Sequence, residues 1–314
     1  MADPQKEAEI LFKAIKDKDE KAIIALCLRT TNAIRLEILN IYKECYNQNL
    51  LANFRSIFND NFLKTLIALF TEPIEYDVNE LKEAINTKNV DTLIEIIVSR
   101  PQNILMQIKD KYNKKYKSDL IKDVENKTSG NVKKILLSFL ECKRSTNTQP
   151  NIEKCKKIAS ELFKAGEARI GTDESVFVKY FSTLSPDELK EVYIAYPKTN
   201  PYYHDLMKVL DSEFSGNSRK ILRNITLSSI NPSSFYACRV DDALKENSIN
   251  NNILIRVLVS RSDIDMEEIN KLFLKEIKKE IYDVVRGKGI SWDYKTLILG
   301  IIDKKNDKKN DEKK

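Results

Sequence analysis

Four stretches of the sequence carry the same ordered set of features, and this repetition limits the possible folds more than any other property of the chain. Each stretch contains an apolar run that aligns with the other three: "AIIALCLR" (22–29), "LIEIIVSR" (93–100), "VFVKYFST" (176–183) and "LIRVLVSR" (254–261). A lysine in the closing segment recurs at Lys64, Lys134, Lys220 and Lys295. The chain therefore repeats one structural unit four times, with a period of roughly 70–85 residues.

The spacing of apolar residues within each unit favours helices. In "ILIRVLVSR", Ile253, Leu254, Val257 and Leu258 form one stripe with the three- and four-residue steps of an amphipathic helix. No segment shows the sustained alternation of a strand, and the 314 residues include only 7 glycines and 8 prolines. We predict an all-α fold of four repeats with about five short helices each. A generic helical solenoid fits less well, because its repeats are only about 34–47 residues long.

Polar turn sequences divide the predicted repeats. The predicted boundaries are 1–72, 73–145, 152–229 and 230–303, with a linker at 146–151 and a charged, disordered tail at 304–314. The stretch between the second and third repeats is the longest and most polar of the connections. We expect it to separate two pairs of repeats.

Composition narrows the functional classes. The formal charge of +6 permits attraction to anionic surfaces, but no dense basic and aromatic patch suggests nucleic-acid binding. No apolar run is long enough to span a membrane, the N-terminus does not resemble a signal peptide, and five scattered cysteines suggest reduced, buried thiols, so we expect a cytoplasmic protein. His204 is the only histidine and is expected to be a surface or loop residue, so we expect neither a Ser-His-Asp triad nor a His-rich metal site, and nothing suggests an enzyme. Trp292 is expected to be a packing anchor at the end of a repeat.

The stretch "ARIGTDESVF" (168–177) combines features that suit calcium. Ca²⁺ takes six to eight oxygen ligands, and backbone carbonyls supply several when the chain bends so that they converge. Gly166 and Gly171 bracket a loop that makes such a bend inexpensive, and Glu213 follows 42 residues after Gly171 as a source of negative charge. A plain helix start is the alternative, since Thr172 is a good N-cap and Asp173 and Glu174 complement the helix dipole.

The sequence resembles the annexins over roughly residues 5–303. The most specific segments are "AGEARIGTDESVF" (165–177) with "LDSEFSGNSRKIL" (210–222) in the third repeat, and "LIRVLVSRSDIDMEEI" (254–269) in the fourth. The resemblance implies four repeats of five helices and a type II calcium site, in which a "GxGT" loop is combined with a downstream acid. It also implies that calcium bridges the protein to lipid phosphate.

Carried over position by position, the resemblance assigns roles to seven residues of the third repeat. The carbonyls of Gly166, Arg169 and Gly171 would bind calcium together with a bidentate Glu213. A weaker second site would use the Thr172 carbonyl and the Glu174 carboxylate. Ile170, at the tip of the loop, would insert among lipid headgroups.

The corresponding loops of the other three repeats depart from this pattern. They read "AIKDKDEKAI" (14–23), which is two residues shorter, "AINTKNVDTL" (84–93) and "ALKENSINNN" (243–252). The position of the downstream acid falls near Ile57, at Lys127, and at Lys288 or Gly289. We expect no type II calcium in these repeats. Lysines near these loops, among them Lys127 and Lys288, are candidates for calcium-independent membrane contact, although ordinary solvated lysine is the alternative.

The leading hypothesis is therefore calcium-dependent binding to anionic phospholipid membranes through one site in the third repeat, at the periphery of the membrane or cytoskeleton. The degenerate loops also resemble those of the alpha-giardins, protist annexins associated with membranes and the flagellar cytoskeleton. The rival hypothesis is a structural scaffold that binds cytoskeletal or flagellar components with little dependence on calcium.

Overall fold

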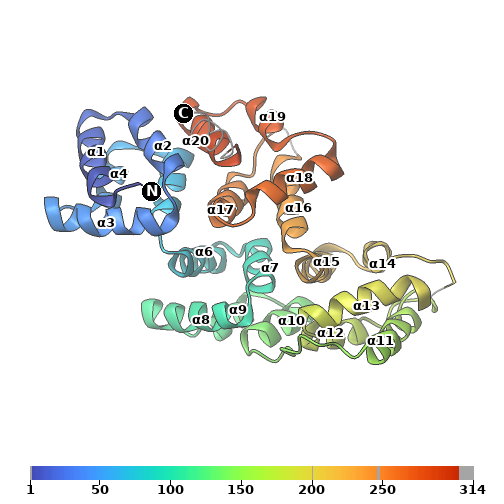
Figure 1. Ribbon diagram of the computed structural model, residues 1–314. Helices are drawn as coiled ribbons and strands as arrows, with labels where there is room; N and C mark the ends of the chain where they lie inside the picture. The colour runs from blue at the N-terminus through green and yellow to red at the C-terminus, as the bar shows by residue number, and fades with distance from the viewer. Residues whose placement is uncertain (1, 200, 246–247, 304–314) are drawn as a thin grey trace. The chain divides into compact units, whose positions relative to one another are not determined.

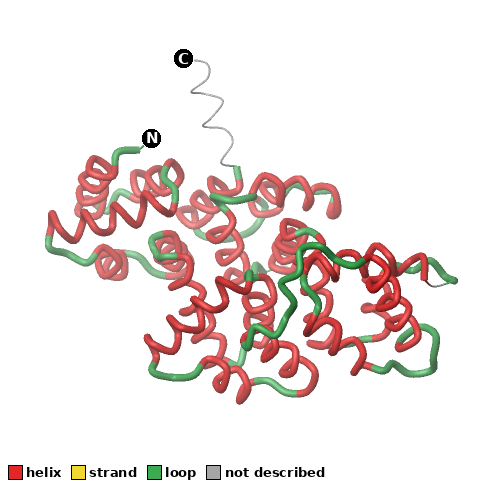
Figure 2. The backbone as a smooth tube through the Cα atoms, turned by 60° about the horizontal axis from the view of Figure 1, so that its bottom comes forward, coloured by secondary structure: helices red, strands yellow, loops and turns green. Residues whose placement is uncertain are grey.

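The computed structural model describes residues 2–199, 201–245 and 248–303, and these residues form twenty α-helices and no strand (Figures 1 and 2). The helices follow one another as four sets of five, which confirms the predicted all-α repeat fold. None of the helices in these ranges is long and apolar enough to cross a membrane. The predicted charged tail lies outside the described residues, and the other predicted repeat boundaries stay predictions.

The five helices of each repeat share a pattern of lengths, with a short fourth helix. The first repeat contains α1 (Pro4–Asp17), α2 (Glu20–Arg29), α3 (Asn32–Tyr46), α4 (Leu50–Ile57) and α5 (Asp60–Leu69). The second contains α6 (Pro73–Thr87), α7 (Val90–Ser99), α8 (Gln102–Tyr116), α9 (Leu120–Lys127) and α10 (Gly130–Leu140). The third contains α11 (Ile152–Ala165), α12 (Glu174–Thr183), α13 (Pro186–Thr199), α14 (Leu206–Glu213) and α15 (Gly216–Ile230). The fourth contains α16 (Pro232–Leu244), α17 (Asn251–Arg261), α18 (Met266–Ile277), α19 (Ile281–Arg286) and α20 (Trp292–Ile302).

The chain folds into two compact units that do not follow its linear order. One unit is Ile74–Phe235 and holds the second and third repeats; the other joins the residues up to 73 to those from 236 onward. The linker between the second and third repeats therefore lies inside one unit, and the expectation that it separates two pairs of repeats was wrong. It packs against α12 and α13, where the Ser145 N–H donates to the Thr183 carbonyl (2.7 Å) and the Ser185 hydroxyl to the Asn147 carbonyl (2.6 Å).

Within each unit, the second helix of one repeat packs against the fifth helix of its partner. In the unit of the second and third repeats, α7 lies against α15 (Figure 1) and α10 against α12. In the other unit, α2 lies against α20 and α5 against α17. Seven of the ten residues of α7 are buried, which explains why this helix is apolar almost all round. Each fully buried aliphatic side chain contributes roughly 1.5–3 kcal/mol, so these helices supply much of the core.

In two repeats, an arginine at the C-terminal end of the second helix or directly after it holds the first helix. Arg100 donates two hydrogen bonds to the Asp77 carboxylate on α6, at 2.6 and 2.8 Å. Arg29 makes the same paired contact with Glu7 on α1, at 2.9 and 2.6 Å. Paired bonds of this kind combine charge with fixed geometry, so they set the orientation of the first two helices.

Two expectations from single residues were wrong. Trp292 is 55% exposed and is not a packing anchor; Tyr294, which is 1% exposed, takes the core position. The buried stripe of α20 contains Tyr294, Leu297 and Ile298, and a residue two positions before Tyr294 lies off that stripe. The cysteines are free, but only Cys27 and Cys155 are buried, and Cys45 is exposed.

Candidate calcium site

The loop between α11 and α12 depends on two glycines for different reasons. Gly166 is buried directly after α11, and an added Cβ there would lie 3.4 Å from the ring of Phe177. Gly171 has a φ of +75°, a left-handed conformation that costs other residues energy, although nothing lies within 4 Å of an added Cβ. The first glycine therefore provides space, and the second provides the bend.

Backbone hydrogen bonds close the base of this loop. The Asp173 N–H donates to the Ala165 carbonyl (2.7 Å), and the Arg169 N–H donates to the Gly166 carbonyl (3.1 Å). Because a carbonyl oxygen has two lone pairs, Gly166 keeps one for a further partner. Asp173, not Thr172, is the N-cap of α12, and its side chain accepts from the Ser175 N–H. Hydrogen bonds from the Ser175 hydroxyl and N–H lower the pKa of Asp173.

Glu213 reaches this loop from the end of α14. The Thr172 hydroxyl donates a hydrogen bond to the Glu213 carboxylate, and an added Cβ on Gly166 would lie 3.7 Å from Glu213 Cγ. Gly216, with a φ of +54°, then turns the chain into α15. The structure thus brings together the two parts of the predicted site, a carbonyl-bearing loop and a half-buried carboxylate. This donor set of carbonyls with one carboxylate suits a hard divalent cation.

The remaining predicted residues lie around the same loop. Ile170 is fully exposed at the tip, with no burial of its side chain. The Arg169 side chain is also exposed and lies 3.9 Å from the Asp173 carboxylate. Glu174 accepts a hydrogen bond from Asn131 at the start of α10, so its carboxylate is directed toward the neighbouring repeat. A second cation at Glu174 would have to share that carboxylate with Asn131.

Sequence reasoning missed a set of side chains that ties this loop to the segment after α13. The Glu167 carboxylate accepts from the Tyr196 hydroxyl (3.1 Å) and contacts His204 Nδ1 (2.6 Å). Burial, followed by the nearby charges of Glu167 and Glu213, raises the pKa of Tyr196. Glu167 therefore links the loop to α13 through Tyr196. No local pattern revealed this, because Glu167 and His204 are 37 residues apart and each resembles an ordinary loop residue.

The first two repeats have a tighter connection at the same place. The hydrogen bond equivalent to Asp173–Ala165 joins Asp19 to Ala14 and Asn89 to Ala84, both at 2.8 Å. These partners are five positions apart instead of eight, so the loops are three residues shorter than in the third repeat, not two as expected for the first. At the end of the fourth helix, where the third repeat has Glu213, these repeats have Ile57 and Lys127. These two repeats therefore lack both the longer loop of the third repeat and its acidic residue.

The fourth repeat keeps a longer connection between its first two helices, but a lysine side chain contacts a backbone carbonyl at the start of this connection. The Asn250 N–H donates to the Ala243 carbonyl (2.9 Å), as Asp173 does to Ala165. The Lys288 ammonium donates to the carbonyl of the next residue, Leu244, at 3.2 Å. Leu244 follows Ala243 as Gly166 follows Ala165, so Lys288 contacts the carbonyl that corresponds to a predicted calcium ligand.

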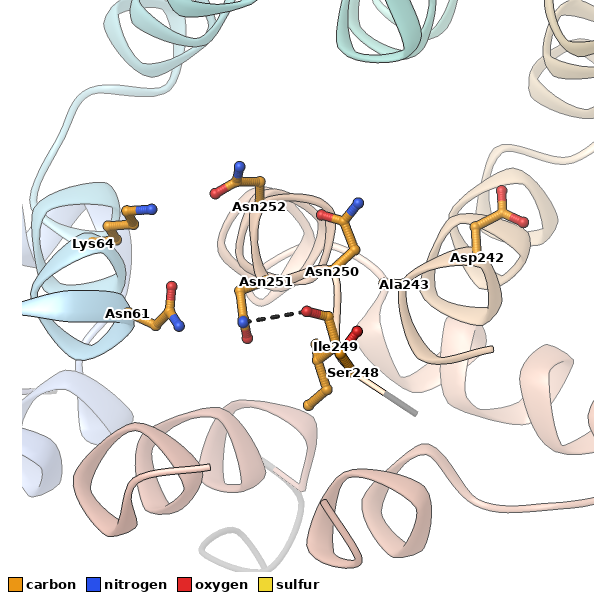
Figure 3. Close-up of a pocket in the computed structure, with 9 residues that line it drawn as sticks. All are labelled: Asn61, Lys64, Asp242, Ala243, Ser248, Ile249, Asn250, Asn251 and Asn252. Atoms are coloured by element: carbon orange, nitrogen blue, oxygen red, sulfur yellow. Dashed lines mark hydrogen bonds between the residues drawn. The ribbon is translucent and has the colours of Figure 1, made fainter. Parts of the chain in front are cut away.

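A pocket of about 440 Å³ adjoins this loop in the same unit (Figure 3). Polar side chains dominate its lining, which consists of Asn61, Lys64, Asp242, Ala243, Ser248, Ile249, Asn250, Asn251 and Asn252. The Asp242 carboxylate supplies the acidic group among them, and it already accepts from Arg239 and Lys245, each at 2.9 Å. The pocket therefore lacks the uncommitted carboxylate that a calcium site requires.

Metal ligation by side chains alone is not supported in the described ranges. No group of three or more His, Cys, Asp or Glu side chains there is placed to hold a metal ion. A calcium site in this part of the chain would have to take most of its ligands from backbone carbonyls. The loop at 166–172 with Glu213 is the arrangement of this kind that the sequence predicts.

Comparison with known proteins agrees with the fold and the repeats. The annexin family model matches residues 76–139, 158–225 and 235–301, together well over half of the chain. Human annexin A5 is 33% identical over 301 residues, which cover 95% of this chain and 93% of annexin A5. Human annexin A7 is 31% identical over 304 residues, which cover 96% of this chain but only 62% of annexin A7. The chain thus spans less than two thirds of that relative.

Solved structures show the same fold. Annexin III superposes with a TM-score of 0.88 at 30% identity, covering 96% of this chain and 94% of annexin III. Calcium-bound alpha-1 giardin superposes with a TM-score of 0.79 at 12% identity, covering 96% of this chain and all of that protein. An identity of 12% shows a shared fold alone, so a particular kinship with the giardins stays a prediction.

Annexins are typically proteins that bind phospholipid in the presence of calcium. The described residues form twenty helices in four sets of five, and the family model matches three of those sets. Relatives above 30% identity extend along nearly the whole chain. This chain belongs to the annexin family.

Proposed function

We propose that this protein binds anionic phospholipid membranes in a calcium-dependent manner through one site in its third repeat. The observation that carries the proposal is the hydrogen bond between Thr172 and Glu213, which brings a carboxylate from α14 to the loop between α11 and α12. The carbonyls of Gly166, Arg169 and Gly171 and the Glu213 carboxylate would hold the ion. When bound, calcium would offer its remaining coordination positions to lipid phosphate.

The loop residues contribute to membrane contact in other ways. Ile170, fully exposed at the tip, adds apolar contact with the headgroup region of the bilayer. The exposed Arg169 adds a positive charge beside it. The Thr172 carbonyl and Glu174 would form the weaker second site, in competition with the hydrogen bond from Asn131. We place the protein in the cytoplasm, at the periphery of a membrane, without an enzymatic activity or a nucleic-acid partner.

The first test is co-sedimentation with vesicles that contain phosphatidylserine, with calcium or with a chelator. Wild type should pellet in calcium. Glu213→Gln keeps the size of the side chain and its hydrogen bond to Thr172 but removes the charge, so it should lose most of the calcium-dependent fraction. Asp211→Asn is the matched control, because this exposed carboxylate lies on the same helix and pairs with Arg223. Full calcium dependence in Glu213→Gln would contradict the proposed site.

A structural scaffold for cytoskeletal or flagellar components is the second candidate. It is favoured by the loss of the loop glycines and of the acid in three of the four repeats, where Ile57, Lys127 and Lys288 stand in place of Glu213. Lys127 and Lys288 are also proposed to contact the membrane without calcium, because each stands at the position of Glu213 near the loop of its repeat. Lys127 is half-buried, and Lys288 contacts the Leu244 carbonyl. Equal pelleting with and without calcium, together with co-sedimentation with microtubules, would favour the scaffold.

A further inference from the structure

The polar pocket beside α17 lies where the fifth helix of the first repeat meets the second helix of the fourth. Its volume of about 440 Å³ is in the range of sites that hold small molecules. Lys64 and Asn61 extend from α5 toward the first turn of α17, which follows Asn250 (Figure 3). The equivalent helix contacts in the other unit show which groups meet such side chains there.

In the unit of the second and third repeats, an acid in the first turn of the second helix closes each of these contacts. Where α7 meets α15, Asp91 pairs with the Lys220 ammonium at 2.8 Å. Where α10 meets α12, Glu174 accepts a hydrogen bond from Asn131. A negative charge on the second helix therefore meets a polar donor on the fifth helix in both places.

The contact between α5 and α17 has the same donors but no such acid. Lys64 and Asn61 are the fifth and second residues of α5, the positions that the two donors of the other unit hold in their helices. The first two residues of α17 are Asn251 and Asn252, where the other unit has its acids. Within the described ranges, the Lys64 ammonium pairs with no carboxylate, and the side-chain amides of Asn61 and Asn252 form no hydrogen bond.

The acid in the pocket lining, Asp242, does not offset this lysine. Its carboxylate accepts from Arg239 and Lys245, each at 2.9 Å, and Lys245 also pairs with Asp241 at 3.0 Å. These two acids and two bases balance one another. Figure 3 shows Asp242 on the opposite side of the first turn of α17 from Lys64. The described lining thus presents one positive charge without a carboxylate partner.

The other polar groups of the lining suit a ligand that carries several oxygen atoms. Asn61 and Asn252 each have an amide that can donate and accept, and Ser248 has an exposed hydroxyl. The N-terminus of α17 adds a partial positive charge, which favours an anion such as phosphate. A phosphate beside Lys64 would fill only part of the pocket, and the remaining polar groups could bind hydroxyl groups of the same molecule.

The lining offers little apolar surface for a lipid chain. Ala243 is buried, Ile249 is half-buried, and none of the large apolar side chains exposed in the described part of the chain lines the pocket. We propose that this pocket binds a small, water-soluble phosphorylated polyol, with its phosphate beside Lys64 in place of the acid that closes the equivalent contacts. Binding here requires neither calcium nor a membrane and so goes beyond the proposed function.

Calorimetric titration of the full chain in a calcium chelator tests this site, with inositol 1-phosphate as the probe. Wild type should bind the probe, and it should bind unphosphorylated inositol about tenfold more weakly, because the charge-assisted hydrogen bond is lost. Lys64→Gln should weaken binding of the probe by about the same factor. Lys134→Gln is the matched control, because this lysine is the fifth residue of α10 and lies outside the pocket lining, so binding should be unchanged.

Asn252→Asp gives α17 the acid that α7 has at the same position. The new carboxylate should pair with Lys64, as Asp91 pairs with Lys220, and should weaken binding of inositol 1-phosphate about tenfold or more. Urea denaturation should show that this variant stays as stable as wild type, which separates a closed site from an unfolded protein. The proposal would be overturned if wild type did not bind the probe, if Asn252→Asp bound it normally, or if Lys134→Gln weakened binding as much as Lys64→Gln.

Pelleting with vesicles that contain phosphatidylinositol 4-phosphate, also in the chelator, distinguishes a lipid headgroup from a soluble ligand. Binding to these vesicles without binding of inositol 1-phosphate would overturn the proposal of a soluble ligand. The calcium site and this pocket fail separately. Glu213→Gln should lose calcium-dependent pelleting and keep its affinity for inositol 1-phosphate, whereas Lys64→Gln should do the reverse.

Discussion

Gly171→Ala tests whether the bent loop of the third repeat is needed for calcium. Gly171 has a φ of +75°, and nothing lies within 4 Å of an added Cβ, so the substitution changes only the preference of the backbone. A residue with a side chain in the left-handed region costs about 1–2 kcal/mol, which corresponds to about 5–30-fold in an equilibrium constant. The reduced entropy of the unfolded alanine chain offsets about 0.4–1 kcal/mol of any loss in stability.

Where this cost appears depends on the loop in the absence of calcium. If the alanine loop relaxes, the cost is incurred on binding, and the dissociation constant for calcium rises by up to about 5–30-fold. If the loop keeps its conformation, the free energy of unfolding falls instead. Isothermal titration with calcium and urea denaturation in chelator measure the two quantities separately.

Gly130→Ala is the matched control for this substitution. Gly130 has a φ of +59° and open space around an added Cβ, but it begins α10 in the second repeat and belongs neither to the 166–172 loop nor to α14. Its neighbour Asn131 contacts Glu174, which is a predicted ligand of the weaker second site alone. Gly130→Ala should therefore lose stability and leave calcium affinity at the Glu213 site unchanged. The reasoning would be refuted if Gly171→Ala altered neither calcium affinity nor stability, or if Gly130→Ala weakened calcium binding as much.

Four further results are expected. Arg35→Ala should destabilise the protein by about 3–5 kcal/mol in urea denaturation, because the buried guanidinium donates to three backbone carbonyls, and Arg35→Lys should not restore the loss. Burial alone would raise the pKa of Glu188, but hydrogen bonds from its neighbours lower it overall. The stability from this carboxylate is therefore present above its unfolded pKa and lost as the pH falls through the folded pKa, so Glu188→Gln should differ from wild type at pH 7 and converge with it in acid. Burial raises the pKa of the Cys155 thiol, so a thiol reagent should label exposed Cys45 in the native protein and Cys155 only after unfolding; simultaneous labelling would contradict this. Glu167→Ala, which frees the loop from Tyr196 and His204, should weaken calcium binding in titration, and unchanged affinity would show that this contact is not needed.

Local sequence patterns predicted the helices well because they depend on nearby residues. The apolar run at 254–261 has the spacing of a helix, and α17 spans Asn251–Arg261. The loop glycines and Glu213 were also recognisable from the sequence, because a left-handed bend favours glycine and a charge-balancing ligand requires an acidic residue. The contact between Glu167 and His204 could not be predicted from local sequence, because only the fold brings these two ordinary loop residues together.

The sequence by itself determined the number of repeats, the helical class and the one loop with both glycines and a distant acid, because these follow from periodicity and residue type. Only the tertiary structure decided that the second repeat pairs with the third and the first with the fourth, since that depends on which apolar faces meet. It also decided that Lys288 reaches the Leu244 carbonyl, and that Tyr294 is buried while Trp292 is exposed. Those outcomes depend on the reach and direction of side chains across the fold, which no single segment encodes.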